Sequence, residues 1–450
     1  MEEIRVLSPT AILGYGFPVS SFEEGLRREP HVIAVDGGST DPGPYYLGSG
    51  KSFTQRQAVK RDLRLLINAA LDRRIPLIIG TGGGSGARPH VEWNWEIIRE
   101  ILAEEGRSAR TAVIFSDIPK ELVLEAIKQG RTAPCGPVPE LTPEAVDSAV
   151  HLVAQMGAEP MITALEQGAD IILAGRAYDP AAFAALPIMR GFDAGLALHM
   201  GKILECAAIA ASPGSGSDCL FGRLGKDSFI LEPLNPARKC TALSVAAHTL
   251  YEKSDPYILP GPGGTLDLSA AEFSELPAGC VEVRGTRFIR SPQYTVKLEG
   301  ARAVGYRTVC IAGVRDPIMI GQIDAVLQAV RERVEDNFEN IGDYFLHFRC
   351  YGKNGVMGEL EPAPSPAHEL GIVIECVAPS QDVADTICGI ARSTLLHYGY
   401  PGRKSTAGNL AFPYSPSDFS VGQVFEFCVH HIMELDDPTG IFPLEWRVIE

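Results

Sequence analysis

The feature that most constrains the fold is a short, largely apolar run that ends abruptly in glycines. The run covers residues 75–79, five of the seven residues at 80–86 are glycine, and a helical pattern follows. This order of apolar run, glycine loop and helix is typical of one unit of a parallel α/β sheet. Glycine allows positive φ, and it has no Cβ to keep a ligand away from main-chain N–H groups.

The glycine loop and the helix start behind it are suited to an anion. We expect the loop to hold a phosphate or a carboxylate, through Gly82, Gly83, Gly84, Ser85 and Gly86. Its spacing does not give the G-x-G-x-x-G pattern of dinucleotide-binding folds, which disfavours a Rossmann-type dehydrogenase. An alternative stays open, namely a tight strand-to-helix turn that binds nothing, because such turns recur in doubly wound folds.

Strand and helix patterns alternate through the first half of the chain. Strands are expected at 32–36, 77–80, 111–115 and 169–173, and helices at 53–74, 93–104 and 119–129. This alternation predicts an α/β fold whose N-terminal region is a doubly wound, mostly parallel sheet. The rhythm changes after about residue 190. From 343 onwards the pattern is that of a smaller α+β unit, so we expect a large domain at 1–342 and a smaller one at 343–450.

Composition excludes several classes of partner. The 450 residues include 40 Lys and Arg against 56 Asp and Glu, a formal net charge of −16. That balance disfavours nucleic acid and anionic membrane surfaces. No run reaches the roughly 18 apolar residues that a spanning helix needs, and the N-terminus lacks a signal-peptide pattern. The ten cysteines are scattered without zinc spacing, so we expect a cytoplasmic protein with free thiols and no metal.

Polar residues follow several of the expected strands. Asp36 is followed by Ser39 and Thr40, and Arg176 stands three residues after the end of the strand expected at 169–173. Ligands of parallel sheets bind beyond the carboxyl ends of the strands. We therefore expect Arg176, Ser39 and Thr40 to hold a substrate anion, and Asp36 to act as an acid or base if burial raises its pKa. The alternative is that these polar groups only cap turns.

A second group of ionisable residues lies in an apolar segment at 192–211, which we expect to be one long buried helix. His199, Lys202 and Cys206 then share one helix face, with Glu205 beside it. Buried charges must be paired or shift their pKa, and enzymes use the same effect to prepare groups for proton transfer. The alternative is an internal ion pair between Lys202 and Glu205.

These motifs resemble the acyclic terpene utilisation (AtuA-like) family. The resemblance covers residues 36–48, 80–86, 174–179, 199–206 and 405–413, which span most of the chain. It implies a role in catabolism that degrades terpenoid alcohols and acids through CoA esters. It also implies a separately encoded small second subunit. It brings no established catalytic residues.

Together these observations favour a catabolic enzyme that acts on a small carboxylate or its CoA ester by acid/base chemistry. A lyase of the hydratase type, or an isomerase, needs one base, one acid and an oxyanion stabiliser. We expect Glu205 or Lys202 to transfer the proton, His199 to orient and Asp36 to assist. No cofactor is expected beyond CoA as part of the substrate, and we expect an oligomer. The alternative is a non-catalytic subunit that binds an acid or acyl-CoA and works only with a partner protein.

Overall fold

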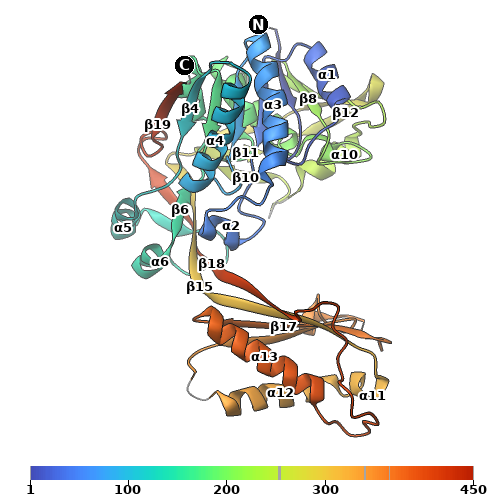
Figure 1. Cartoon of the computed structure of the whole chain (residues 1–450). Coiled ribbons are helices and arrows are strands. Elements are labelled where there is room, and N and C mark those ends of the chain that lie inside the picture. Colours follow the sequence, from blue (N-terminus) through green and yellow to red (C-terminus); the bar gives the residue numbers. More distant parts are fainter. Residues whose placement is uncertain (1, 252–254, 339–340, 364, 449–450) are drawn as a thin grey trace. The chain divides into compact units, whose positions relative to one another are not determined.

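The computed structural model describes residues 2–251, 255–338, 341–363 and 365–448. The chain forms two compact units, which can be followed by colour in Figure 1. The larger holds Met1–Arg302 and Phe427–Glu450, and the smaller holds Ala303–Glu426. The boundary expected at 343 falls inside the smaller unit. The reason is that α12 (Ile323–Asn337) packs against α13 (Gln381–His397) in the core of that unit.

Among the described residues, the main sheet of the larger unit has ten strands. Its central strands run parallel in the order β1 (Ile4–Ser8), β2 (Val32–Asp36), β3 (Leu77–Gly80), β7 (Ile171–Ala174) and β4 (Arg110–Ile114). Antiparallel strands extend it beyond β1: β8 (Leu220–Leu224), β9 (Ser228–Pro233), β13 (Cys280–Arg284) and β12 (Glu272–Leu276). At the other edge, β19 (Leu444–Val448) is antiparallel to β4.

The two faces of the parallel strands bury separate cores, because successive side chains of a strand point to opposite faces. In β2, Ile33 and Val35 join one core and Val32 and Ala34 the other. The first core includes side chains of α1 (Val19–Arg27), α3 (Arg56–Arg73) and α4 (Arg88–Glu104). The second includes side chains of α5 (Lys120–Lys128), α6 (Pro143–Ser148), α7 (Glu159–Glu166), α8 (Ala181–Met189), α9 (Ala194–Leu204) and α10 (Ala242–Thr249).

Several shorter elements complete the larger unit. They are α2 (Pro44–Ser49), the 3₁₀ turns η1 (Ala207–Ala210) and η2 (Pro277–Gly279), and a sheet of β10 (Ile258–Gly261), β11 (Gly264–Asp267) and β14 (Arg287–Arg290). Two long strands, β15 (Tyr294–Val314) and β18 (Asp418–Leu435), continue from this unit into the smaller one. Within the larger unit, β15 pairs with β6 (His151–Ala154) and β18 with β5 (Thr132–Pro134).

The smaller unit is an antiparallel sheet with helices packed on it. β16 (Phe345–Tyr351) pairs with β17 (Leu370–Ala378), which pairs with β15, and β18 lies on the other side of β15. α12 and α13 bury the apolar residues of one sheet face. The short helix α11 (Pro317–Ile320) precedes α12, and η3 (Gly358–Leu360) follows β16.

The predicted mixed α/β class is confirmed, and the strands expected at 32–36 and 77–80 have the predicted bounds. The helix expected at 192–211 is wrong in its second half. α9 ends at Leu204, and Ala207, the first residue of η1, adopts a left-handed φ of 46°. Cys206 therefore does not share a helix face with His199. The ten cysteines are free thiols. None of the described helices has the length and apolar character that crossing a membrane requires.

Candidate functional site

The candidate site lies in the larger unit, where the parallel strands end. Asp36 is the last residue of β2, and the glycine loop begins at Gly80, the last residue of β3. Arg176 follows β7 by two residues. β2, β3 and β7 are neighbours in the sheet. The carboxyl ends of neighbouring parallel strands meet at one edge, which is where such sheets bind ligands.

Arg176 lies directly against the glycine loop. Its backbone N–H donates to Gly86 O at 3.2 Å and to Ser116 Oγ at 2.7 Å, and its Nη1 donates to Thr81 Oγ1 at 3.4 Å. An added Cβ on Gly86 would stand 2.2 Å from Arg176 N, and Gly86 has a φ of +74°. Close backbone approach thus requires glycine at this position, whether or not the loop binds a ligand.

Some backbone N–H groups of the glycine loop make hydrogen bonds within the protein, and others do not. Gly82 N–H donates to Ala174 O at 2.7 Å, and Gly84 N–H donates to Thr81 O at 3.4 Å. Within the described residues, the N–H groups of Gly83, Ser85 and Gly86 donate to no protein acceptor. All three residues are buried. Neighbouring N–H groups without a protein acceptor, at the end of a parallel strand, are suited to bind an anion by donating hydrogen bonds to it.

Arg176 is the centre of a buried charge network. Its Nε donates to Glu299 Oε2 at 2.6 Å, and its Nη1 donates to Asp179 Oδ1 at 3.1 Å. The other oxygen of Glu299 accepts from Thr40 Oγ1 at 2.8 Å and lies 2.9 Å from Lys297 Nζ. Burial opposes the charge of Glu299, but Arg176 and Lys297 hold the pKa of this carboxyl below its ordinary value. Burial likewise opposes the charge of Arg176, yet Glu299 and Asp179 raise its pKa.

Lys202 connects α9 to this network. Its Nζ donates to Glu205 Oε1 at 2.6 Å and lies 3.9 Å from Asp179 Oδ2. The internal ion pair of the alternative interpretation is therefore present. Asp179, whose side chain is 20% exposed, joins Lys202 to Arg176 and is the most accessible of these acids. Lys202 of α9 and the Arg176 network beside the glycine loop thus belong to one cluster.

Asp36 stands apart from the other acids of this cluster because its charge is disfavoured. Burial raises the pKa of Asp36 well above its ordinary value, and the carboxylates of Asp179 and Glu205 raise it further. The N–H of Gly38 and the charge of Arg176 oppose the shift without reversing it. Around it, the ion pairs between described residues join Asp179, Glu205 and Glu299 to Arg176, Lys202 and Lys297. A buried carboxyl with a raised pKa has the properties of a general acid.

Two predicted residues point to other surroundings. His199 is buried, and its ring nitrogens bond to Thr286 Oγ1 at 2.7 Å and Thr249 Oγ1 at 3.0 Å. Its ring packs edge-on against Phe229 of β9. The hydroxyl of Ser39 donates to the exposed Asp41 at 2.7 Å. The roles predicted for both residues stay predictions, as do those of the other candidate residues.

Sequence reasoning missed Glu299 and Lys297. Both lie in β15, where they alternate with the buried Val296 and Leu298. Such alternation is typical of a strand with one solvated face, but Glu299 is 1% exposed. The signal that could have found it is an acid and a base two residues apart on one strand face.

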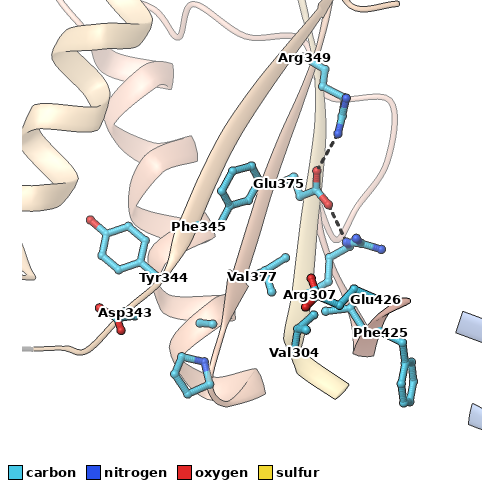
Figure 2. Close-up of a pocket in the computed structure, with 13 residues that line it drawn as sticks. Val304, Arg307, Asp343, Tyr344, Phe345, Arg349, Glu375, Val377, Phe425 and Glu426 are labelled. Atoms are coloured by element: carbon cyan, nitrogen blue, oxygen red, sulfur yellow. Dashed lines mark hydrogen bonds and ion pairs between the residues drawn. The ribbon is translucent and has the colours of Figure 1, made fainter. Parts of the chain in front are cut away.

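The smaller unit holds a separate cavity of about 590 Å³, shown in Figure 2. It opens on the sheet face opposite to α12 and α13. Glu375 bonds there to Arg307 at 2.6 Å and lies 3.5 Å from Arg349. These charged groups satisfy one another, so this cavity is a weaker candidate than the cluster around Arg176. Within the described residues, no group of three or more His, Cys, Asp or Glu is arranged to hold a metal ion.

The fold and the site define a mixed α/β protein with a buried cluster of acids and bases at the carboxyl ends of its parallel strands. The family model described as acyclic terpene utilisation family protein AtuA matches residues 50–214 and 227–418. The chain therefore belongs to the acyclic terpene utilisation family, which indicates a role in acyclic terpene catabolism. No curated protein and no solved structure matches the chain in the corresponding comparisons.

Proposed function

We propose that this protein is a catabolic enzyme that acts on a small carboxylate or its CoA ester by acid/base chemistry. The leading reaction is addition or removal of water, and isomerisation would use the same groups. The observation that carries the proposal is the raised pKa of the buried Asp36 beside the cluster of charged residues around Arg176. Pairs of titratable groups whose surroundings shift their pKa values in opposite directions are typical of acid/base active sites.

In this proposal the substrate anion lies between Arg176 and the glycine loop. Nε and Nη1 of Arg176 are used by Glu299 and Asp179, while Nη2 donates to no group of the described chain. That nitrogen and the unpaired loop N–H groups supply donors for a carboxylate or for an enolate oxygen. Glu299 serves as the positioning residue, because it fixes the guanidinium plane.

The proton transfers in this proposal involve two carboxyl groups, one that accepts a proton and one that donates a proton. In the direction of hydration, Glu205 takes a proton from water as the water oxygen bonds to the carbon β to the carbonyl. The proton of Asp36 goes to the α-carbon, so that H and OH are added across the double bond. Lys202 Nζ donates to Glu205 Oε1 at 2.6 Å and holds this carboxyl in position for the step.

The test is deuterium exchange at the α-carbon, which reports proton transfer for a hydratase, lyase or isomerase alike. The protein is incubated in D₂O with acyclic branched carboxylates and with their CoA esters, and exchange is followed by NMR. We expect Asp36→Asn to abolish the exchange that the wild-type protein catalyses. The exposed residue Asp227 provides a matched control, and Asp227→Asn should exchange like the wild type.

Two results would oppose the proposal. If these compounds bind and exchange begins only after a partner protein is added, the result would support the non-catalytic subunit instead. Exchange that Asp36→Asn leaves unchanged would remove the buried acid from the mechanism.

A further inference from the structure

A second cavity of the smaller unit combines positive charge with free donors. Its volume is about 620 Å³, within the range of small-molecule sites. It is bounded by the end of β15, by α11, and by the loop at 400–411 that follows α13. Figure 1 labels α11 in the smaller unit. The loop includes part of the segment 405–413, which the proposed function does not use.

The loop is fixed by many contacts rather than loosely attached. Gly313 and Ala411 exchange two backbone hydrogen bonds, at 2.8 and 2.9 Å. The Nδ2 of Asn409 donates to two carbonyls at the end of α13, at 2.9 and 2.8 Å. Arg403 donates to His397 O at 3.2 Å and to a second carbonyl within the loop. A cavity wall held in this way is preorganised for a ligand.

The charges of this cavity are not neutralised. Arg315 and Lys404 are exposed, and within the described residues neither side chain makes a hydrogen bond or a close ion pair; the charge of Lys404 acts on Asp316 only at longer range, where it helps to lower the pKa of that carboxyl. Arg403 is bonded only to neutral carbonyls, and its buried Nε has no described partner. Asp316 is the one acid among the described residues of the lining, and it already accepts from the hydroxyl of Tyr400 and from a backbone N–H. Three cations against one acid leave a positive cavity in a chain of net charge −16.

We propose that this cavity binds a phosphate monoester, with the dianion held by Arg315, Lys404 and Arg403 and the organic group resting on Ile318 and Leu410. A surplus of two positive charges matches the charge of a phosphate monoester near neutral pH. Arginine and lysine are the side chains that recognise phosphate, arginine as a fork and lysine as a point charge. The apolar lining and the volume leave room for an attached group of nucleoside size. This site is independent of the proposed reaction in the larger unit.

Calorimetric titration of the full chain with adenosine 5′-monophosphate tests the proposal. We expect binding that adenosine does not share and that weakens as salt rises. Arg315→Ala and Lys404→Ala should each weaken binding by about tenfold or more, since each removes a charged hydrogen bond. Arg315→Lys should lose less than Arg315→Ala, because it keeps the charge. Arg333→Ala is the matched control, since Arg333 is an exposed arginine of the same unit that does not line the cavity.

Further arms identify the source of the phosphate. CoA carries a phosphate monoester that dephospho-CoA lacks. Tighter binding of CoA than of dephospho-CoA, sensitive to Arg315→Ala, would assign the site to a CoA ester. Equal, Arg315-dependent binding of adenosine 5′-monophosphate and ribose 5-phosphate would assign it to free phosphate esters.

The proposal is overturned if adenosine 5′-monophosphate does not bind, or if Arg315→Ala and Lys404→Ala bind it like the wild type. Both variants change exposed side chains, so circular dichroism should show an unchanged fold. Failure of this site would leave the exchange assay with Asp36→Asn unaffected, so the two proposals fail separately.

Discussion

The pair of Arg176 and Glu299 allows a quantitative test of the site's physical basis. Their side chains are 3% and 2% exposed, and Nε and Oε2 are 2.6 Å apart. Removing one partner leaves the other charge buried without its main partner, which costs about 3–5 kcal/mol. We therefore expect Arg176→Met and Glu299→Met each to lower the free energy of unfolding by that amount. The double variant should lose clearly less than the sum, with a coupling of at least about 2 kcal/mol.

An exposed pair of equal geometry provides the control for this cycle. Arg56 and Glu100 also approach to 2.6 Å, but their side chains are 46% and 38% exposed. Solvent screening should limit their coupling to about 0.2–1 kcal/mol. Both pairs lie in the larger unit. If the two cycles give equal coupling energies, burial does not strengthen the Arg176 network and the reasoning is refuted.

The assay can be confined to the larger unit. All three tryptophans of the chain lie in that unit, at Trp93, Trp95 and Trp446. Urea denaturation followed by tryptophan fluorescence therefore reports the unit that contains both pairs. A change in the dependence on urea, rather than in the midpoint, would indicate an altered unfolded state instead of a lost ion pair.

Three further predictions concern single positions. Gly86→Ala should destabilise the protein by about 1–3 kcal/mol more than Gly106→Ala in urea denaturation. Both glycines have positive φ, but only at Gly86 would the Cβ overlap a backbone atom, at 2.2 Å. Asp36→Asn should be more stable than the wild type at alkaline pH. Because folding raises the pKa of Asp36, the free energy of unfolding of the wild type falls as pH rises above the ordinary range of aspartate, by up to about 1.4 kcal/mol per pH unit. Below that range the variant should have no advantage in stability. Lys202→Met should lower the melting temperature because Glu205 loses its 2.6 Å ion pair, and it should also abolish deuterium exchange; early melting with unchanged exchange would make Lys202 purely structural.

The parallel half of the fold could be predicted because its strands are buried on both faces. Such strands are short, continuous apolar runs, and β2 and β3 were found at their bounds for that reason. The strands β8 and β9 could not be predicted in this way. β8 takes its position by pairing with β1, which is more than 200 residues away in the sequence, and β9 by pairing with β8.

The site was predictable only where it follows a strand end. Asp36, the glycine loop and Arg176 do so, and the geometry brings them together. Glu299 enters the site from β15, whose antiparallel partner is β6, so no rule for parallel strands could place it. The end of α9 also could not be predicted from the apolar pattern of the sequence, because nothing in the sequence indicates that an alanine will adopt a left-handed φ.

The smaller unit leaves the larger one through β15 and returns through β18, which are neighbours in one sheet. At that point the two strands are close, since an added Cβ on Gly300 would stand 3.0 Å from the Cβ of Val429. The smaller unit is thus an insertion whose two ends meet, and a short turn could join the same strands. Residues 303–426 can therefore lengthen, shorten or be exchanged in evolution without altering the order of strands that builds the acid/base cluster.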